Sequence, residues 1–587
     1  MKNQHIELEQ GVVDVVSLLD CSPDGGELAF VSTRDFQGEN LNDWKGALSE
    51  GLASDGGLYD PREVPAPFEE AFFSEQLPYL ELAEVSSLIL RRFIPREDIP
   101  DEELLKMLRE AHNFGLPLEE ITQVFDGVME GGEKGGKVLL AWLDRGPTAS
   151  FKDFAARVMG KLLEWWCSEN NHPMNIIVAT SGDTGVAIAR AFEGSKWVSV
   201  TVMYPSGGVS DIQEKQMIQA DQQNKNVQCF PIEGDFDRAQ SMSKILQETR
   251  SQTEQIINSV DYRENYTKEV NTRIGENLSS DELITLAQSI GKINLGSANS
   301  INAWRYLPQQ TQFFVSYGEA LKEGYIQPRE KVYFSVPTGN VGHLMAGVTA
   351  KEMGVPIEGF ILATNQNDIM VILINEGILR HKGLEKSVAP SMDILNASNA
   401  ERLLDYARKK SDPSAQIDFI GIRNVFQDTP EEREALKGGI DIRNFGVTDK
   451  MLAYLGDLIP FTAGVTGDEE IAETMKEVYT KTRGRSLPDS HGATGIRVIQ
   501  KGLEQGAIPK NAKVISLVTA NPHKFPQALE NAGIEQVPEK YRHEELELAT
   551  GGIQVDTQKR ETLLSIMKIM EVISSLDKQM KEQRESV

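Results

Sequence analysis

Short apolar runs rich in β-branched residues recur from the middle of the chain onward, and stretches with helical spacing separate them. The runs cover residues 137–143, 175–180, 197–204, 227–232, 331–336, 357–364 and 513–519. Nearly continuous apolar strands that alternate with helices are typical of a parallel sheet covered by helices on both faces. The pattern therefore predicts an α/β protein.

Other parts of the chain are mainly helical in pattern. "REDIPDEELLKMLREAH" (96–112) indicates a capped amphipathic helix, and the glycine-rich "GGEKGG" (131–136) indicates a junction before the first long strand. We expect an N-terminal extension (1–30), a mainly helical N-terminal domain (31–130), an α/β body (131–540) and a C-terminal helical tail (541–587). A polar helical insertion is expected near 240–290. The tail carries apolar residues at helical spacing, which favours packing on the body or on a partner subunit.

Charge and composition narrow the class of protein. The 587 residues carry a net charge of −28, which disfavours binding to nucleic acid or to an anionic membrane surface. The N-terminus lacks the pattern of a leader peptide and no apolar run is long enough to cross a bilayer, so we expect a cytoplasmic protein. The three cysteines, Cys21, Cys167 and Cys229, are too scattered to indicate a disulfide framework or a metal site.

Three loops follow predicted strands directly, and ligands of open α/β sheets collect at the carboxyl ends of strands. "SGDTG" (181–185) and "TGNVG" (338–342) each lead from a strand into a helix, and Thr519 ends the last apolar run. The glycines of the second loop suit a phosphate group, although the loop is neither a dinucleotide fingerprint nor a Walker loop. Ordinary turns and helix caps are the alternatives for all three loops.

A lysine also lies beyond a predicted strand, in "GPTASFKDFAARVMG" (146–160). If Phe151 and Phe154 shield Lys152 from water, its charged form is disfavoured and the amine can act as a nucleophile. A reactive lysine, a phosphate loop and a hydroxyl at a strand end are together the groups that hold pyridoxal 5'-phosphate.

At this point the motifs resemble those of the threonine synthase family. The matching segments include "GPTASFKDFAARVMG", "ATSGDTGVAIARAF", "NSINAWRYLPQQTQFFVSY", "VPTGNVGHLMAGVTAKEMGVPI", "VSTRD" (31–35), "GLASDGGLYDPREVP" (51–65) and "PSMDILNASNAERLL" (390–404). They run in order from about residue 31 to about residue 526. The resemblance implies the longer branch of the family, with an N-terminal domain before two α/β domains of fold type II, similar to tryptophan synthase β.

The family's activity implies roles for individual residues. Enzymes of this family use pyridoxal 5'-phosphate to convert O-phospho-L-homoserine and water to L-threonine and phosphate, by γ-elimination and addition of water at the β carbon. Lys152 would bond the cofactor aldehyde and then act as the base that moves protons at the α and β carbons. Asp183 would lie beside the cofactor 3-hydroxyl and Thr519 beside its pyridine nitrogen. The cofactor phosphate would bind the loop formed by Thr338, Gly339, Asn340, Val341 and Gly342.

The substrate would be bound by a second set of residues. By the resemblance, Ser181, Thr184, Asn299 and Arg305 recognise the substrate phosphate. The fork of Arg305 suits a phosphate and supplies positive charge in an acidic protein, although a structural ion pair is the alternative for this arginine. We expect O-phosphohomoserine as a small-molecule partner, no nucleic-acid or membrane partner, and a monomer or homodimer.

The chain departs from the family pattern in two segments. The usual "DPHTAVG" is "DSHGATG" here (489–495), and "MVILINEG" (370–377) replaces the arginine and phenylalanine that commonly follow "NDI". These changes keep open a threonine-synthase-like phospho-lyase, which would release a 2-oxo acid, ammonia and phosphate. A catalytically silent binding protein is disfavoured by the presence of Lys152 together with the phosphate loop, and a nucleotide-binding enzyme by the lack of either fingerprint loop.

Overall fold

Two compact units make up the described chain. The computed structural model describes residues 15–25, 28–132, 135–234, 236–380, 383–425, 438–462, 465–543, 546–547 and 566–585. The first unit holds the described residues of Met1–Trp44, Ala53–Ala155 and Ala303–Arg542, and the second holds those of Lys45–Leu52, Ala156–Asn302 and His543–Val587. Among these residues, no helix combines the length and the apolar character needed to cross a bilayer.

A six-stranded sheet forms the centre of the first unit. Its strands are β3 (Leu118–Glu120), β4 (Lys137–Trp142), β9 (Val332–Pro337), β10 (Ile357–Ala363), β13 (Phe461–Thr462) and β14 (Lys513–Val518). The order is β13-β10-β9-β14-β4-β3, and every neighbouring pair is parallel except β3 and β4. All six residues of β14 are buried, as expected for a central parallel strand.

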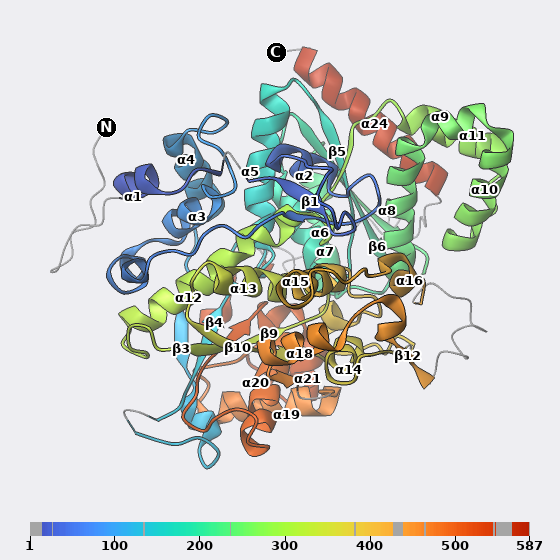
Figure 1. Cartoon of the computed structure of the whole chain (residues 1–587). Helices are drawn as coiled ribbons and strands as arrows, with labels where there is room; N and C mark the ends of the chain where they lie inside the picture. Colours follow the sequence, from blue (N-terminus) through green and yellow to red (C-terminus); the bar gives the residue numbers. More distant parts are fainter. Residues whose placement is uncertain are drawn as a thin grey trace. The chain divides into compact units, whose positions relative to one another are not determined.

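Helices cover this sheet on both faces (Figure 1). They include α12 (Gln310–Lys322) and α13 (Gly342–Glu352) on one face, and α19 (Asp468–Lys481), α20 (Ser490–Glu504) and α21 (Pro526–Asn531) on the other. Side chains of the strands and of α19 and α20 form one core, which includes Val138, Ile361 and Ile496. Between β10 and α19 the first unit also contains α14 (Ile369–Glu376), β11 (Ile378–Leu379), α15 (Ala400–Ser411), α16 (Phe419–Asn424), β12 (Ile440–Asp441) and α18 (Asp449–Leu458).

The second unit contains a separate, fully parallel sheet of four strands. These are β5 (Met174–Ala179), β6 (Val198–Pro205), β7 (Val227–Ile232) and β8 (Leu295–Ser297), in the order β7-β6-β5-β8. The accompanying helices are α6 (Asp183–Ala191), α7 (Asp211–Gln223), α8 (Phe236–Ser251), α9 (Thr253–Asn258), α10 (Val260–Ile274) and α11 (Ser280–Ile290), together with most of α5 (Asp153–Glu169). Residues 240–290 are thus mostly helical.

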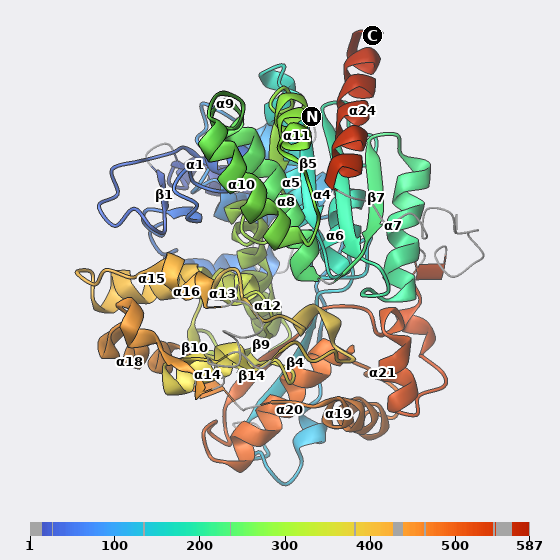
Figure 2. The same ribbon diagram turned by 90° about the vertical axis from the view of Figure 1, so that its right-hand side faces the viewer.

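The C-terminal helix α24 (Ile566–Glu585) packs on the second unit. It contacts β5, β6 and α11, and Figure 2 shows it running beside the sheet. Its apolar face buries Ile566, Ile569 and Ile573 completely, in the core that also contains side chains of α8, α10 and α11. Packing on the body, one of the two expected arrangements, is therefore the one observed.

The N-terminal part of the first unit consists mainly of the helices α1 (Val15–Cys21), α3 (Leu82–Leu90) and α4 (Asp101–Ala111) and of an antiparallel pair of strands, β1 (Phe30–Ser32) and β2 (Tyr59–Pro61). The short helix α2 (Trp44–Glu50) falls almost entirely in the second unit. The helix expected over 96–112 is present as α4, which begins after Pro100. Acidic residues in its first turn and Arg109 in its last turn complement the helix dipole.

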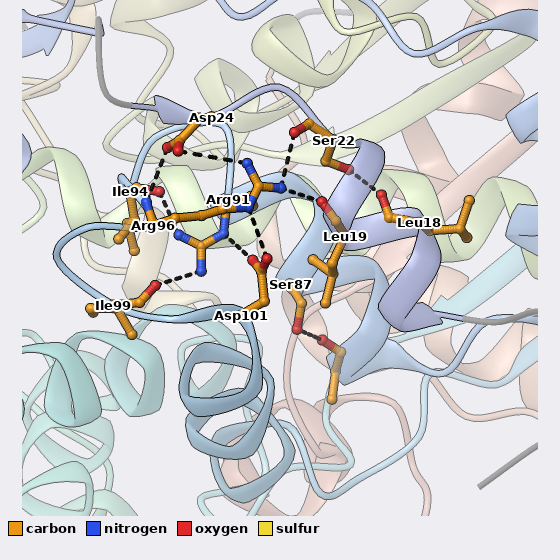
Figure 3. A network of polar contacts seen from close by, with 11 residues as sticks. Leu18, Leu19, Ser22, Asp24, Ser87, Arg91, Ile94, Arg96, Ile99 and Asp101 are labelled. Atoms are coloured by element: carbon orange, nitrogen blue, oxygen red, sulfur yellow. Dashed lines mark hydrogen bonds and ion pairs between the residues drawn. The ribbon is translucent and has the colours of Figure 1, made fainter. Parts of the chain in front are cut away.

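A buried arginine joins these helices (Figure 3). Arg91 is fully buried, and its Nε lies 2.6 Å from Asp101 Oδ1 at the start of α4. Its Nη1 and Nη2 donate to the carbonyls of Ile94 (2.8 Å) and Ile99 (2.7 Å). Arg96 binds the other Asp101 oxygen at 2.8 Å. Burial lowers the pKa of Arg91, and the Asp101 carboxylate opposes that shift.

We predict that Asp101→Ala lowers the free energy of unfolding by about 3 kcal/mol, because it leaves the Arg91 charge buried without its counter-ion. Asp24→Ala is the control, since the Asp24 side chain is 43% exposed and lies 3.6 Å from Arg96. Its effect should stay below about 1 kcal/mol. Urea unfolding of the two variants measures both values, and equal losses would contradict the role assigned to Arg91.

Candidate active site at the carboxyl ends of the strands

Lys152 and Thr519 come together because β4 and β14 are neighbours. The segment that follows β4 returns to the end of β14, where the Phe151 N–H donates to the Thr519 carbonyl (2.8 Å). The Asn521 N–H donates in turn to the Ala149 carbonyl (3.0 Å). Within the described residues the Thr519 hydroxyl makes no hydrogen bond, so it is available to a ligand. Lys152 and Thr519, which the sequence analysis places at opposite sides of one cofactor, thus lie on neighbouring segments that are joined by backbone hydrogen bonds.

An aromatic pair lies next to Lys152. The lysine is half-buried, and its Nζ is 4.3 Å from the centroid of the Phe151 ring. Phe151 stacks on His343 with ring centroids 4.6 Å apart. Gln312 Nε2 donates to the Phe151 carbonyl (3.3 Å), which fixes this residue from the side of α12. Part of the shielding expected around Lys152 is therefore present.

The start of α5 is anchored on both sides of the lysine. The Asp153 carboxylate accepts bonds from the Thr148 N–H and the Thr148 hydroxyl, each 2.8 Å. Phe154, the second residue expected to shield Lys152, packs its ring against Phe114 (5.0 Å) and His112 (5.6 Å). Its observed contacts thus secure the start of α5 to the N-terminal part of the first unit.

The phosphate loop Thr338–Gly342 joins β9 to α13, next to β14. Val341 has φ 65°, a left-handed conformation that is unfavourable for a β-branched residue. Within the described residues, the N–H groups of Gly339, Asn340 and Val341 donate no hydrogen bond. These donors stand at the N-terminus of the eleven-residue helix α13. Such an arrangement is suited to binding an anion.

In the second unit, a threonine that the sequence analysis missed shapes the loop after β5. Thr180 Oγ1 accepts from the N–H groups of Gly182 (2.9 Å) and Gly185 (2.8 Å). Gly182 has φ 135°, and a Cβ there would lie 2.3 Å from the Gln213 side chain, so only glycine fits. Gln213 Nε2 also donates to Asp183 Oδ1 (2.8 Å), which fixes this carboxylate at the start of α6.

The other proposed substrate residues of the second unit follow β5 and its neighbour β8. Ser181 and Thr184 are half-buried, and their hydroxyls make no hydrogen bond to the described residues. Asn299 is nearly buried, and its Oδ1 accepts from the Ala179 N–H (3.0 Å) at the end of β5. Its Nδ2 lies 3.5 Å from Ser243 Oγ. The Asn299 oxygen is therefore engaged within the protein, and its amide nitrogen is the group that could face a ligand.

Arg305 belongs to the first unit, six residues beyond Asn299. It ends a short 3₁₀ helix, Ala303–Arg305, and is 3% exposed. Burial lowers the pKa of its guanidinium to about 10, which leaves it charged at neutral pH. The candidate residues thus divide between the units: Lys152, Arg305, Thr338–Gly342 and Thr519 in the first, and Ser181, Asp183, Thr184 and Asn299 in the second.

Comparisons with known proteins agree with the motifs. A family model described as "Threonine synthase N terminus" matches residues 29–112. The threonine synthase of Pseudomonas aeruginosa is 32% identical over 517 residues, which cover 87% of this chain and 92% of that protein. That of Saccharomyces cerevisiae is 30% identical over 514 residues, covering 85% and 88%. The chain belongs to the threonine synthase family.

A solved structure extends the comparison to the fold. The structure titled as a PLP-bound threonine synthase from Brucella melitensis has a TM-score of 0.67 and 29% sequence identity, covering 94% of this chain and 99% of that one. The family and the fold type II architecture expected from the motifs are therefore confirmed.

The segment that departs from the family's "DPHTAVG" keeps its aspartate and histidine, and these two side chains link two parts of the site. His491 Nδ1 donates to Asp489 (2.8 Å), and its Nε2 accepts from the Ser391 N–H (3.1 Å). The other Asp489 oxygen accepts from Ala520 N–H (3.2 Å), one residue after Thr519. The Ser391 carbonyl lies against Gly339, where an added Cβ would approach it to 2.6 Å. The pair therefore ties the end of β14 to the turn behind the phosphate loop.

His343 is a second site residue that sequence reasoning missed, although it directly follows "TGNVG". It is 6% exposed, and neither ring nitrogen has a hydrogen-bond partner among the described residues. Burial, and after it the positive charge of Lys152, lower the pKa of His343 to about 3. The imidazole is therefore neutral at physiological pH and presents a polar edge beside the lysine.

We predict that His343 makes the protein acid-sensitive between pH 6.5 and about 3. In this window the unfolded chain binds a proton on His343 that the folded protein does not, so stability falls as pH falls. The slope contributed by one proton is at most about 1.4 kcal/mol per pH unit. Unfolding free energies measured from pH 7 to pH 4 should show a shallower slope in His343→Gln than in the wild type. Parallel slopes would show that the histidine is protonated in the fold.

Proposed function

We propose that this threonine synthase family member converts O-phospho-L-homoserine and water to L-threonine and phosphate, using pyridoxal 5'-phosphate bound at the carboxyl ends of β4, β14 and β9. The observation that carries the proposal is the convergence, at three adjacent parallel strands, of a lysine, a hydroxyl and backbone N–H groups that have no acceptor in the described part of the chain. Family membership and the PLP-bound relative from Brucella melitensis support the same conclusion.

The groups present fit this cofactor. The N–H donors of Gly339, Asn340 and Val341 suit its phosphate dianion, since they need no cation to balance it locally. Lys152 would supply the amine that bonds its aldehyde, and the Thr519 hydroxyl, which makes no hydrogen bond within the described residues, would meet the ring nitrogen. Asp183, held by Gln213, is proposed to face the 3-hydroxyl.

When bound, pyridoxal phosphate supplies an electron sink that stabilises negative charge on the substrate carbons. The chain itself must move the protons. The Lys152 amine is proposed to take a proton from the α carbon and to transfer protons at the β carbon, before water adds there. The Phe151 ring lies 4.3 Å from Nζ and stacks on His343, so the lysine has an aromatic ring on one side.

The substrate phosphate is proposed to bind Ser181, Thr184, Asn299 and Arg305. Two hydroxyls without partners in the described protein and one amide nitrogen provide neutral donors, and the buried Arg305 provides the charge. Such donors stabilise the negative charge that the phosphate gains as its ester bond breaks, which favours its departure. A cytoplasmic location, a monomeric or homodimeric state and the absence of nucleic-acid partners stay predictions from the sequence.

An assay of the purified protein on O-phosphohomoserine tests the proposal. We expect threonine and inorganic phosphate in equal amounts with little 2-oxobutyrate, and no turnover by Lys152→Ala. The product ratio matters because the segment "MVILINEG" (370–377) departs from the family pattern and keeps the phospho-lyase reaction open as an alternative. If the products were mainly 2-oxobutyrate and ammonia, the protein would be a phospho-lyase and the proposed activity would be wrong.

We predict that Arg305→Met raises the KM for O-phosphohomoserine by about 10- to 100-fold, the range expected when a charged hydrogen bond is lost. Cofactor content should be unchanged, because the guanidinium is assigned to the substrate and not to the cofactor. Arg250→Met is a matched control, since Arg250 is a half-buried arginine of the second unit that donates to the Ile293 carbonyl (2.7 Å). A similar KM in Arg305→Met and the wild type would favour a purely structural ion pair.

A further inference from the structure

The back of the phosphate loop is held by a second loop just before α15. The Asn340 carbonyl accepts from the Asn399 N–H (3.2 Å) and from Asn399 Nδ2 (2.9 Å). The Asn340 side-chain oxygen accepts from the Ser398 N–H (3.2 Å) and hydroxyl (2.9 Å). Both oxygens of Asn340 are therefore bound on the same side.

These bonds set the direction of a phosphate donor. The Asn340 carbonyl and the Val341 N–H belong to one trans peptide plane and point in opposite directions. Fixing the carbonyl on Asn399 therefore aims the Val341 N–H away from α15. Because Val341 is held in an unfavourable left-handed conformation, the surrounding bonds must maintain that orientation.

Asn399 is in turn oriented by a buried arginine. Arg402 is fully buried, and its Nη1 donates to Asn399 Oδ1, which leaves Nδ2 directed at the Asn340 carbonyl. Arg402 Nη2 donates to the Tyr59 carbonyl (2.7 Å), and its Nε lies 3.5 Å from Asp60. Tyr59 and Asp60 belong to β2, so a strand of the N-terminal domain holds the arginine.

The segment that directly follows β1 holds α15 at the neighbouring residue. Glu401 accepts two bonds from Arg34, each 3.0 Å, and one from the Thr33 hydroxyl (2.6 Å). Asp60 also accepts from the Tyr306 hydroxyl, and the Tyr306 ring lies 5.1 Å from the Arg402 guanidinium. The motifs "VSTRD" and "GLYDP", which had no assigned role, thus meet the start of α15.

We propose that Arg402, held by Tyr59 and Asp60 of β2, is a positioning residue that keeps the phosphate loop in its anion-binding form through Asn399. The N-terminal domain would then contribute to cofactor affinity without touching the cofactor. This inference rests on the proposed function, because it takes Thr338–Gly342 as the loop that binds the cofactor phosphate.

Asn399→Asp is the sharpest test. The substitution keeps the size of the side chain and the bond to Arg402, but it replaces the donor facing the Asn340 carbonyl with an acceptor. Pyridoxal phosphate is titrated into the apo form of Lys152→Ala, in which affinity reports non-covalent binding alone. We expect Asn399→Asp in this background to weaken binding by about tenfold, the equivalent of one hydrogen bond. A Kd within twofold of the parent would overturn the proposal.

A matched control separates positioning from general stability. Asn226 is a buried asparagine of the second unit whose Nδ2 donates to the carbonyls of Phe192 (2.7 Å) and Val198 (2.9 Å). Asn226→Asp should lower the melting temperature of the apo protein, yet leave the Kd for pyridoxal phosphate within twofold. Equal weakening of cofactor binding in both variants would show a global effect and would overturn the proposal.

A variant in β2 tests the series of contacts that runs from the N-terminal domain through Arg402 and Asn399 to the phosphate loop. Asp60→Asn retains an acceptor for Tyr306 but removes the charge facing Arg402, and it should weaken cofactor binding about threefold. If Asn399→Asp does not fold, this variant decides the question, and an unchanged Kd rejects the proposal. Failure of Lys152→Ala and of the wild type to bind any cofactor would instead reject the proposed function itself.

Discussion

The parallel pairing of β14 with β4 on one side and β9 on the other is the constraint on which the site depends. Ser516 lies opposite Leu140 and Ser335 in this register, so the three strands end at the same edge. That edge carries Lys152, Thr519 and the phosphate loop. Because side chains alternate along a strand, a slip of one residue in β14 would turn Thr519 to the other face of the sheet and separate it from the lysine.

Polar contacts from distant segments then fix the loops that the sheet brings together. Asp489 and His491 join the end of β14 to the turn behind Gly339, and Arg402 joins β2 to the start of α15. Arg91 likewise joins the end of α3 to the start of α4. In each case a buried polar group is satisfied by main-chain atoms, so its removal leaves a carbonyl or N–H without a partner, which is costly. The site is thereby tied to the N-terminal part of the same unit.

The sequence predicts the strands and the main site residues, but not the contacts that support them. Each of the seven apolar runs forms a strand. Such strands can be recognised because burial on both faces requires a nearly continuous run of apolar residues. Lys152 and the phosphate loop are recognisable by their position after strands. His343 and Arg402 escaped notice because their roles arise from tertiary contacts: the partner of Arg402, Tyr59, is 343 residues away. The ring contacts of Phe154 with Phe114 and His112 were missed for the same reason. Thr180 was missed although its bonds to Gly182 and Gly185 are local, because a threonine at a strand end has no distinctive pattern in the sequence.

The most direct test of the account is to find which lysine bonds the cofactor. The protein reconstituted with pyridoxal phosphate is reduced with borohydride, digested and mapped by mass spectrometry. The account predicts one phosphopyridoxyl group, on the peptide that contains Lys152. Lys524 is the internal comparison, because it is fully buried nearby and donates to the Thr148 carbonyl (2.9 Å). Modification of Lys524 or of a surface lysine, with Lys152 unmodified, would contradict the account.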